Sequence, residues 1–360
     1  MNSRERFLGI MNYQPADRMM VWDFYYWPET LERWKKEGLP EDADPAEFLG
    51  IDKRWKLLEV KTGPYPVFGE EVIKDEGETV IMLDSWGRRV RVPKSEKKRE
   101  STFPQFLEFP IKKRADFEGY CKRLNPTESG RYPNDWPEVV RKHKSRDYPL
   151  GLHIDGLFAF CRQMIGLESV SILFYDDPDL IEEMMEYQAC FAIEYAKPLL
   201  KELDFDFAIF WEDMAYNKGS LISPSLVKKM MLPRYKRITD FLRGHGIDLV
   251  WVDSDGTVKE LVPIWLEAGI NIFFPAEQGT SDNDIRLWRK RFGRSVRIIG
   301  GIDKFEVAKG KEAIEIQIKK NIENIREGGF IPLLDHSVPP GVSLDNYRYY
   351  LDAIRKIRMD

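Results

Sequence analysis

The stretch DLVWVDSDG, residues 248–256, decides the fold of this chain. An apolar run ends there in two carboxylates, Asp253 and Asp255, and a glycine follows. Strands of α/β proteins commonly deliver polar side chains at their carboxyl ends in this way. Because residues two apart on a strand point to the same side, we expect the side chains of Asp253 and Asp255 to lie close together.

The same pattern repeats from residue 148 onward, where each apolar strand is followed by a longer amphipathic helix. The predicted strands cover residues 149–155, 205–213, 248–255, 270–274, 296–303 and 330–336. The predicted helices cover residues 178–202, 224–243, 259–268, 282–292, 311–327 and 344–357. This alternation predicts a parallel sheet with right-handed crossover connections.

The N-terminal third is less regular. The segment MMVWDF, residues 19–24, predicts a buried first strand, and a further strand is expected within residues 50–60 or elsewhere in this irregular part. Alternating segments in residues 55–92 predict β-hairpins. The whole chain, 1–360, is therefore expected to be a single (β/α)8 TIM barrel with a β-hairpin insertion at about 54–147. A doubly wound open sheet is the alternative, although neither a GxGxxG nor a P-loop motif follows any strand.

Composition limits the function classes. With 360 residues, of which 43% are hydrophobic, the chain can bury a large core. Its net charge of -5 gives no reason to expect nucleic acid or an anionic membrane as a partner. The start MNSRERF lacks the apolar core of a signal peptide, so a cytoplasmic enzyme is expected. The three cysteines have no CxxC spacing, which predicts reduced thiols.

Charged or imidazole side chains end nearly every predicted strand. They are Asp23, His153, Asp155, Glu212, Asp213, Asp253, Asp255, Asp303, Asp335 and His336. An aspartate at such a point is also a common N-cap of the next helix, and Asp303 is predicted to be one. The coincidence of several favours a site at the mouth of the barrel. Two adjacent carboxylates repel unless a cation or a proton lies between them, so a metal or a shared proton is expected.

Large aromatic residues surround these strand ends. Most of them are expected to pack in the core. The four consecutive aromatics of residues 24–27 cannot all face the core, however, so some are expected to line a pocket for a flat apolar substrate. The candidates for substrate binding are Trp22, Tyr25, Phe158 and Trp251.

Several longer segments resemble the uroporphyrinogen decarboxylase superfamily. They are RERFLGIMNYQPADRMMVWDF (4–24), GLHIDGLFAFCRQMIGLESV (151–170), ISP (222–224), IIGGID (298–303) and GGFIPLLDHSVPPGVSLDNYRYYLDAIRK (328–356). The similarity extends over almost the whole chain. It implies a (β/α)8 barrel, and the superfamily includes both true decarboxylases and corrinoid-dependent methyltransferases.

The decarboxylase branch fits this sequence poorly. Its members carry an arginine-containing RQAGRY-like segment after the first strand, where this chain reads DFYYWPE at residues 23–29. Asp52 is only a partial match to the aspartate of their FSDI-like motif. A porphyrinogen bound without those arginines would leave buried carboxylates unpaired, which costs several kcal/mol.

The methyltransferase branch fits with substitutions. Its HxCG motif and late cysteine, which hold zinc, correspond here to DSDG at residues 253–256 and to His336. The resemblance thus implies a divalent metal, with zinc expected, held by Asp253, Asp255 and His336. Carboxylates in place of thiolates favour polarising the oxygen of a methyl ether over carrying a thiol. Glu212 is a further catalytic candidate beside the metal, and Tyr26 or His153 is expected to protonate the leaving phenolate.

The expected function is a corrinoid-dependent methyltransferase or O-demethylase acting on a small, methoxylated aromatic substrate. The chain has no DxHxxG motif, so the corrinoid is expected on a separate protein, and the resemblance implies a homodimer. One alternative is a decarboxylase-like enzyme that acts without metal on another carboxylated cyclic substrate, with Asp253 and His336 as acid and base. Another is a non-catalytic barrel that binds a tetrapyrrole or corrinoid.

Overall fold

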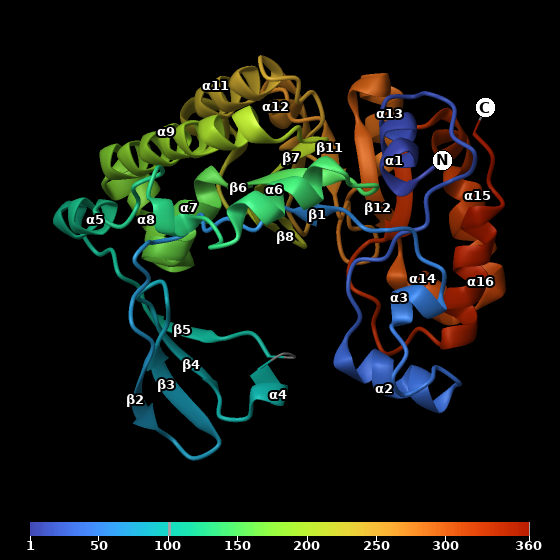
Figure 1. The fold of residues 1–360 in the computed structure, drawn as a ribbon, viewed down its shortest axis with the longest axis horizontal. Coiled ribbons are helices and arrows are strands. Elements are labelled where there is room, and N and C mark those ends of the chain that lie inside the picture. The colour runs from blue at the N-terminus through green and yellow to red at the C-terminus, as the bar shows by residue number, and fades with distance from the viewer. Residues whose placement is uncertain (100–101, 360) are drawn as a thin grey trace.

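A curled parallel sheet of seven strands forms the centre of the molecule in the computed structural model, which describes residues 1–99 and 102–359 (Figure 1). The strands follow the order β1-β6-β7-β10-β11-β12-β13, and every neighbouring pair is parallel. Their bounds are β1 (Lys56–Leu57), β6 (Leu150–Asp155), β7 (Phe207–Trp211), β10 (Val250–Asp253), β11 (Ile272–Phe274), β12 (Arg297–Ile302) and β13 (Phe330–Leu334). This arrangement is consistent with a TIM-like barrel.

Helices follow the strands, as the sequence predicts. The main ones are α7 (Leu157–Ile165), α8 (Leu167–Asp176), α9 (Pro178–Glu202), α11 (Leu232–Arg243), α12 (Val262–Glu267), α13 (Ile285–Phe292), α14 (Lys304–Lys309), α15 (Lys311–Glu327) and α16 (Leu344–Arg355). The predicted helix 224–243 is divided into α10 (Pro224–Leu226), a π-helical turn (Val227–Met231) and α11. Among the described residues, no single helix is long and apolar enough to cross a membrane. The pair α7 and α8 reaches that length and apolar character only in combination, and it is bent by 109°.

The predicted first strand at residues 19–24 is wrong, because these residues form no regular strand in the structure. Side-chain bonding replaces the ladder: the backbone N–H of Val21 donates to the Asp52 carboxylate at 2.9 Å, and the Asp52 N–H donates to the Val21 carbonyl at 2.9 Å. Tyr26 then bridges in parallel to Val338, just after β13. Residues 21–26 are therefore hydrogen-bonded on one side to the residues that precede β1 and on the other side to the residues that follow β13. The strand expected within residues 50–60 is confirmed as β1.

Aromatic side chains fill the interior enclosed by the sheet. The Trp55 ring lies 4.9 Å from Trp22 and 5.1 Å from Trp251 between centroids, and Trp251 lies 5.1 Å from Phe207 and 5.3 Å from Phe274. Trp251 and Asp253 point to the same side of β10, because strand residues two apart share a face. Asp253 therefore lies above the Trp251 ring, at the carboxyl end of the strand. The side chain of Asp253 thus lies above a buried layer of aromatic rings.

A separate antiparallel sheet of four strands lies at one side of the parallel sheet (Figure 1). Its strands are β2 (Glu71–Asp75), β3 (Thr79–Leu83), β4 (Arg89–Pro93) and β5 (Gln105–Glu108). A small cluster of Val80, Val90 and Val92 forms its own core. The short helix α4 (Glu96–Arg99) lies in the tract that connects β4 to β5.

The remaining elements are shorter or lie mostly in the N-terminal half of the chain. They are α1 (Ser3–Met11), α2 (Pro28–Lys36), α3 (Pro45–Phe48), α5 (Arg114–Cys121), α6 (Trp136–Lys144), the two-stranded β8 (Ala215–Tyr216) and β9 (Gly219–Ser220), and the 3-10 turns Ser129–Arg131 and Gly293–Ser295. Helix α2 begins with proline and its end is followed by Gly38 with φ of 112°, as its sequence pattern suggests.

Candidate functional site

Three carboxylates meet at the carboxyl ends of β7 and β10. Oxygen atoms of Asp213, Asp253 and Asp255 all lie within 4.8 Å of one another, close enough to hold one metal ion. Asp213 follows β7 with φ of 43°, a left-handed conformation that is costly for a residue with a side chain. Since β7 and β10 pair in register with Trp211 opposite Asp253, that turn brings Asp213 to the neighbouring strand end.

Electrostatics within this cluster are strongly unfavourable when all three groups are charged. Burial raises the pKa of Asp253 well above its ordinary value, and the charges of Asp213 and Asp255 add to the effect. Burial and the charge of Asp255 also raise the pKa of Asp213. No hydrogen bond or ion pair to the Asp253 side chain is found in the described part of the chain. The cluster is therefore suited to sharing a proton or binding a cation.

Two basic side chains flank the cluster. His336, which follows β13, has its Nε2 atom 3.5 Å from Oδ2 of Asp255. The hydrogen bond to Asp255 raises the pKa of His336, although burial opposes the rise. Arg162 of α7 reaches to 3.6 Å from Asp213 and lies over the ring of Trp211 at 5.4 Å. Of the predicted trio, Asp253 and Asp255 lie together with Asp213 in the group close enough to hold one ion, and His336 lies beside this group, next to Asp255.

A cavity of about 570 Å³ opens over these groups. Asp213, Asp253, Asp255 and His336 form its polar side, and its walls are aromatic: Phe24, Tyr25, Tyr26, Trp27, Phe103 and Trp211. Arg99 and Thr102, which precede β5, also line it. Such a volume fits a small molecule, and the walls fit a flat apolar one.

A buried ion pair anchors the aromatic wall. Asp23 is fully buried and pairs with the guanidinium of Arg54, whose Nη1 donates to the carbonyl of Phe24 at 3.0 Å. The Arg54 guanidinium also lies over the Tyr26 ring at 5.8 Å. Although the segment DFYYWPE, residues 23–29, contains no arginine, the fold brings Arg54 next to Asp23. That arginine is a residue which local sequence patterns do not reveal.

A second buried network supports His336. Asp335, the preceding residue, is fully buried and accepts hydrogen bonds from the backbone N–H of Gln278, Gly279 and Lys304, at 2.8 to 3.1 Å. The Lys304 ammonium lies 3.2 Å from Asp335 and 3.4 Å from Glu277. These bonds tie together the loops after β11, β12 and β13, so Asp335 holds its neighbour His336 in place.

Glu212, a catalytic candidate from the sequence, lies outside the cavity lining. Its buried carboxylate accepts the backbone N–H groups of Leu157, Phe158 and Ala159, at 2.7, 3.0 and 3.1 Å, and the hydroxyl of Tyr235. Burial raises the pKa of Glu212 to about 7. The residue stabilises the positive N-terminus of α7 and joins it to β7.

The other candidates divide between cavity and core. Tyr25 and Tyr26 line the cavity, and the buried hydroxyl of Tyr26 has no hydrogen-bond partner among the described residues. His153 lies 3.1 Å from Asp155, away from the cavity lining. The rings of Trp22, Phe158 and Trp251 are fully buried in the core, so the structure does not bring them to the cavity. Asp303 caps α14 through the N–H of Phe305 at 2.8 Å, which confirms that prediction.

Sequence patterns do not reveal several of the lining residues. Asp213 lies at the end of a predicted strand, but it comes close to Asp253 only because β7 and β10 are neighbours in the sheet. The sequence does not show that these two strands are adjacent. Phe103 and Arg99, which line the cavity, come from the tract that precedes β5, and Arg162, which lies beside Asp213 but not in the lining, comes from α7. No local pattern marks these three as parts of one site.

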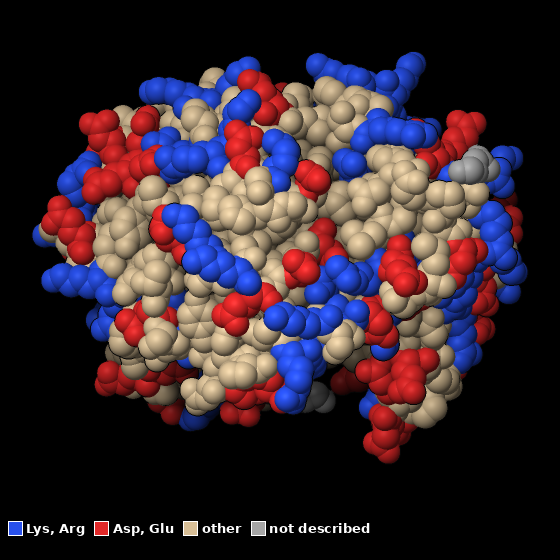
Figure 2. Space-filling view, turned by 45° about the horizontal axis from the view of Figure 1, so that its top comes forward, with Lys and Arg blue, Asp and Glu red and all other residues tan. Residues whose placement is uncertain are grey.

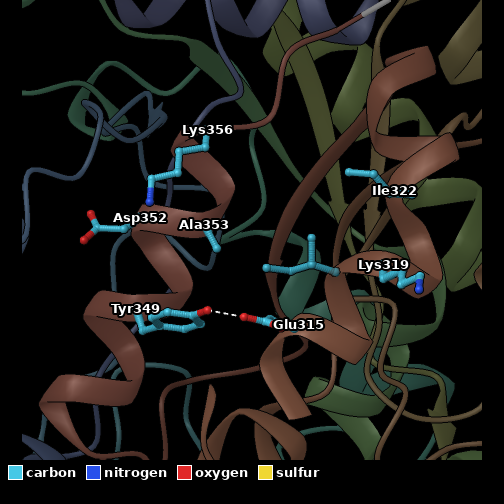
Figure 3. Close-up of a pocket in the computed structure, with 8 residues that line it drawn as sticks. Glu315, Lys319, Ile322, Tyr349, Asp352, Ala353 and Lys356 are labelled. Atoms are coloured by element: carbon cyan, nitrogen blue, oxygen red, sulfur yellow. Dashed lines mark hydrogen bonds between the residues drawn. The ribbon is translucent and has the colours of Figure 1, made fainter. Parts of the chain in front are cut away.

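Another cavity, of about 530 Å³, lies on the outside between α15 and α16 (Figure 3). Glu315, Lys319, Asp352 and Lys356 line it, and the Tyr349 hydroxyl donates to Glu315 across it. Its charges are mixed, and none of its lining residues comes from a strand end. The cavity over the carboxylates is therefore the better candidate for the functional site.

Comparisons with known proteins agree with this fold. The uroporphyrinogen decarboxylase (URO-D) family matches residues 2–357. No curated protein matches the chain. A solved methyltransferase from Methanosarcina mazei is similar in fold, with a TM-score of 0.60 at 16% identity and 98% of each chain covered. A B12-independent methionine synthase from Shewanella sp. W3-18-1 has a TM-score of 0.45 at 15% identity, with 94% of this chain and 91% of that chain covered.

Proposed function

Because this chain belongs to the uroporphyrinogen decarboxylase family, we propose that it is an enzyme that moves a methyl group from a small substrate to a corrinoid. The substrate class proposed is a methoxylated aromatic compound, and the corrinoid is carried by a separate protein that docks at the cavity. The observation that carries the proposal is the close group of Asp213, Asp253 and Asp255 at the base of an aromatic-walled cavity.

The side chains present fit a divalent metal. Three carboxylates and the imidazole of His336 offer oxygen and nitrogen donors, a set that suits zinc, manganese or iron. The Asp253 carboxylate, with its raised pKa, gains most from a bound cation. Asp253, Asp255 and His336, joined by Asp213, would hold the ion. When bound, it would supply Lewis acidity toward the ether oxygen of the substrate.

The chain's own residues supply binding and proton transfer. Tyr25, Trp27 and Trp211 would hold the arene, because aromatic rings bind flat apolar surfaces well. Loss of the methyl group as a cation equivalent leaves a phenolate, which needs a proton. Tyr26, which lines the cavity although its hydroxyl is buried, is the proposed donor. His153, farther from the cavity lining, is the second choice for this role.

A metal-free decarboxylase is the second candidate. The raised pKa of Asp253 would favour a protonated carboxyl there, ready to act as an acid with His336 as its partner. The same three carboxylates would, however, repel the carboxylate of such a substrate. Methyl transfer from a neutral substrate is therefore the better fit.

Metal content and demethylation of a methoxylated aromatic test the proposal together. We expect about one divalent ion per chain by elemental analysis, with loss of the ion and of methyl transfer to free cob(I)alamin in Asp253→Asn and His336→Ala. Asp303→Asn is the matched control, since asparagine also caps helices and Asp303 lies outside the carboxylate group. Equal metal content and activity in all three variants would rule the mechanism out.

A further inference from the structure

Positive charge is concentrated at the end of the sheet opposite the carboxylates. Residues 286–297 include Arg286, Arg289, Lys290, Arg291, Arg294 and Arg297 and no acidic residue, although the whole chain has a net charge of -5. This segment forms α13 and the start of β12. Figure 1 shows α13 at the upper right of the sheet, and Figure 2 shows several Lys and Arg side chains along the upper right edge of the molecule.

A cavity of about 720 Å³ opens beside this segment. Arg243, Arg294 and Arg297 line it, and Glu267 is the one acidic residue among its described lining residues. Glu267 already pairs with Lys228, at 3.2 Å. Arg243 lies 3.0 Å from Asp240 and 3.9 Å from Asp248, so Arg294 and Arg297 carry the excess positive charge. The charge of the cavity lining is therefore positive.

Arg297 and Arg294 carry most of this uncompensated charge. Arg297 is half-buried and donates from Nε to the carbonyl of Met11 at 2.7 Å, but no carboxylate lies within ion-pair distance of it in the described parts of the chain. Arg294 shares Glu327 with Arg289, at 3.1 and 2.5 Å. Both guanidinium carbons lie over the Tyr13 ring, 5.3 and 5.0 Å from its centroid. The Tyr13 ring and the Met11 carbonyl thus hold the guanidinium groups of Arg294 and Arg297 near each other, with only Glu327 to neutralise them.

We propose that this cavity binds a small phosphate-bearing anion through Arg297 and Arg294, with Arg243 at its edge. A guanidinium group presents paired N–H donors that match the oxygens of a phosphate. Two such groups fixed near one ring suit an anion with several charged oxygens, such as a diphosphate, better than a single carboxylate. The site lies at the opposite end of the sheet from the carboxylates, so the inference does not depend on the proposed methyl transfer.

Calorimetric titration of the full chain with inorganic pyrophosphate, and separately with inorganic phosphate, tests the site. We expect saturable binding of one pyrophosphate, tighter than phosphate and weakened by salt. Arg297→Met should reduce the affinity about tenfold or more, because charged hydrogen bonds are lost. Arg297→Lys, which keeps the charge without the paired donors, should fall between parent and Arg297→Met.

Arg291→Gln is the matched control. Arg291 lies on α13, three residues before Arg294, and is exposed, but it is not among the residues that line the cavity, so its loss should leave the affinity nearly unchanged. An equal loss in Arg291→Gln and Arg297→Met would show diffuse surface attraction and overturn the site. Absence of saturable binding at millimolar pyrophosphate would overturn it as well. Thermal unfolding of each variant checks folding, and if Arg297→Met fails to fold, Arg297→Lys and Arg294→Gln decide.

Discussion

The buried pair of Asp23 and Arg54 should make the protein less stable as pH rises, and a single substitution should remove that effect. Asp23 is fully buried beside the Arg54 guanidinium, and burial raises the pKa of its carboxyl to about 6 although Arg54 opposes the rise. Arg54 is the partner of Asp23, and its side chain is 32% exposed. Removing the carboxylate charge therefore leaves a guanidinium group that water can still reach.

The direction and the size of this stability change follow from the raised pKa of Asp23. Between pH 3.8, the ordinary pKa of an aspartate, and about pH 6, the folded state holds a proton that the unfolded state has lost, so stability falls as pH rises through this range. The rise in pKa corresponds to about 3 kcal/mol, lost in full above pH 6. Asp23→Asn should abolish this loss. At pH 8 we therefore expect a free energy of unfolding equal to or up to about 3 kcal/mol above that of the parent.

Urea unfolding at pH 5 and pH 8 measures the effect. Arg54→Met is the contrasting variant, since it leaves the buried carboxylate without its cation and should cost about 3–5 kcal/mol at pH 8. The reasoning fails if Asp23→Asn is destabilised as much as Arg54→Met at pH 8. It also fails if the difference in unfolding free energy between the parent and Asp23→Asn is the same at pH 5 and at pH 8.

Three further changes test other parts of the molecule. Glu212→Gln should lower the free energy of unfolding by about 2–4 kcal/mol in urea, because an amide cannot accept the four hydrogen bonds now made to the carboxylate, and Tyr235→Phe should cost less. Lys304→Met should cost about 3 kcal/mol by leaving the buried Asp335 without a cation, and Lys304→Arg should recover part of this. Phe103→Ala should weaken binding of a methoxylated aromatic severalfold in a fluorescence titration without changing the melting temperature, since the ring is 89% exposed and lines the cavity. The exposed Tyr175 of α8 provides the control, as Tyr175→Ala should leave that binding unchanged.

Much of the fold could be predicted because apolar runs and their polar ends are local signals. The bounds of α9 and α15 match the predicted ranges 178–202 and 311–327, where helical periodicity and flanking proline or glycine coincide. The segment at residues 19–24 shows the limit of such signals. A strand and an extended segment bonded by the Asp52 side chain have the same apolar sequence, and only the distant aspartate distinguishes them.

The candidate site could be predicted in part for similar reasons. Asp253 and Asp255 are linked by spacing along one strand, and the family resemblance adds His336. Asp213 joins them only through a left-handed turn on the neighbouring strand. The expectation that Trp22, Phe158 and Trp251 lie at the cavity is wrong because a sheet that curls on itself buries the same large rings that a substrate pocket displays. To tell a core ring from a pocket ring, one must know how far each ring lies from the carboxyl end of the sheet, and the sequence does not give that position.

The aromatic plug beneath the carboxylates also gives the protein an internal optical reporter. Trp22, Trp55 and Trp251 form a continuous chain with centroid separations of 4.9 and 5.1 Å, short enough for excitation energy to pass readily among the rings. Trp251 stands two residues before Asp253, so whatever occupies the cavity floor lies next to one member of this chain. Occupancy of the site should therefore alter the tryptophan emission of the native protein with no label attached.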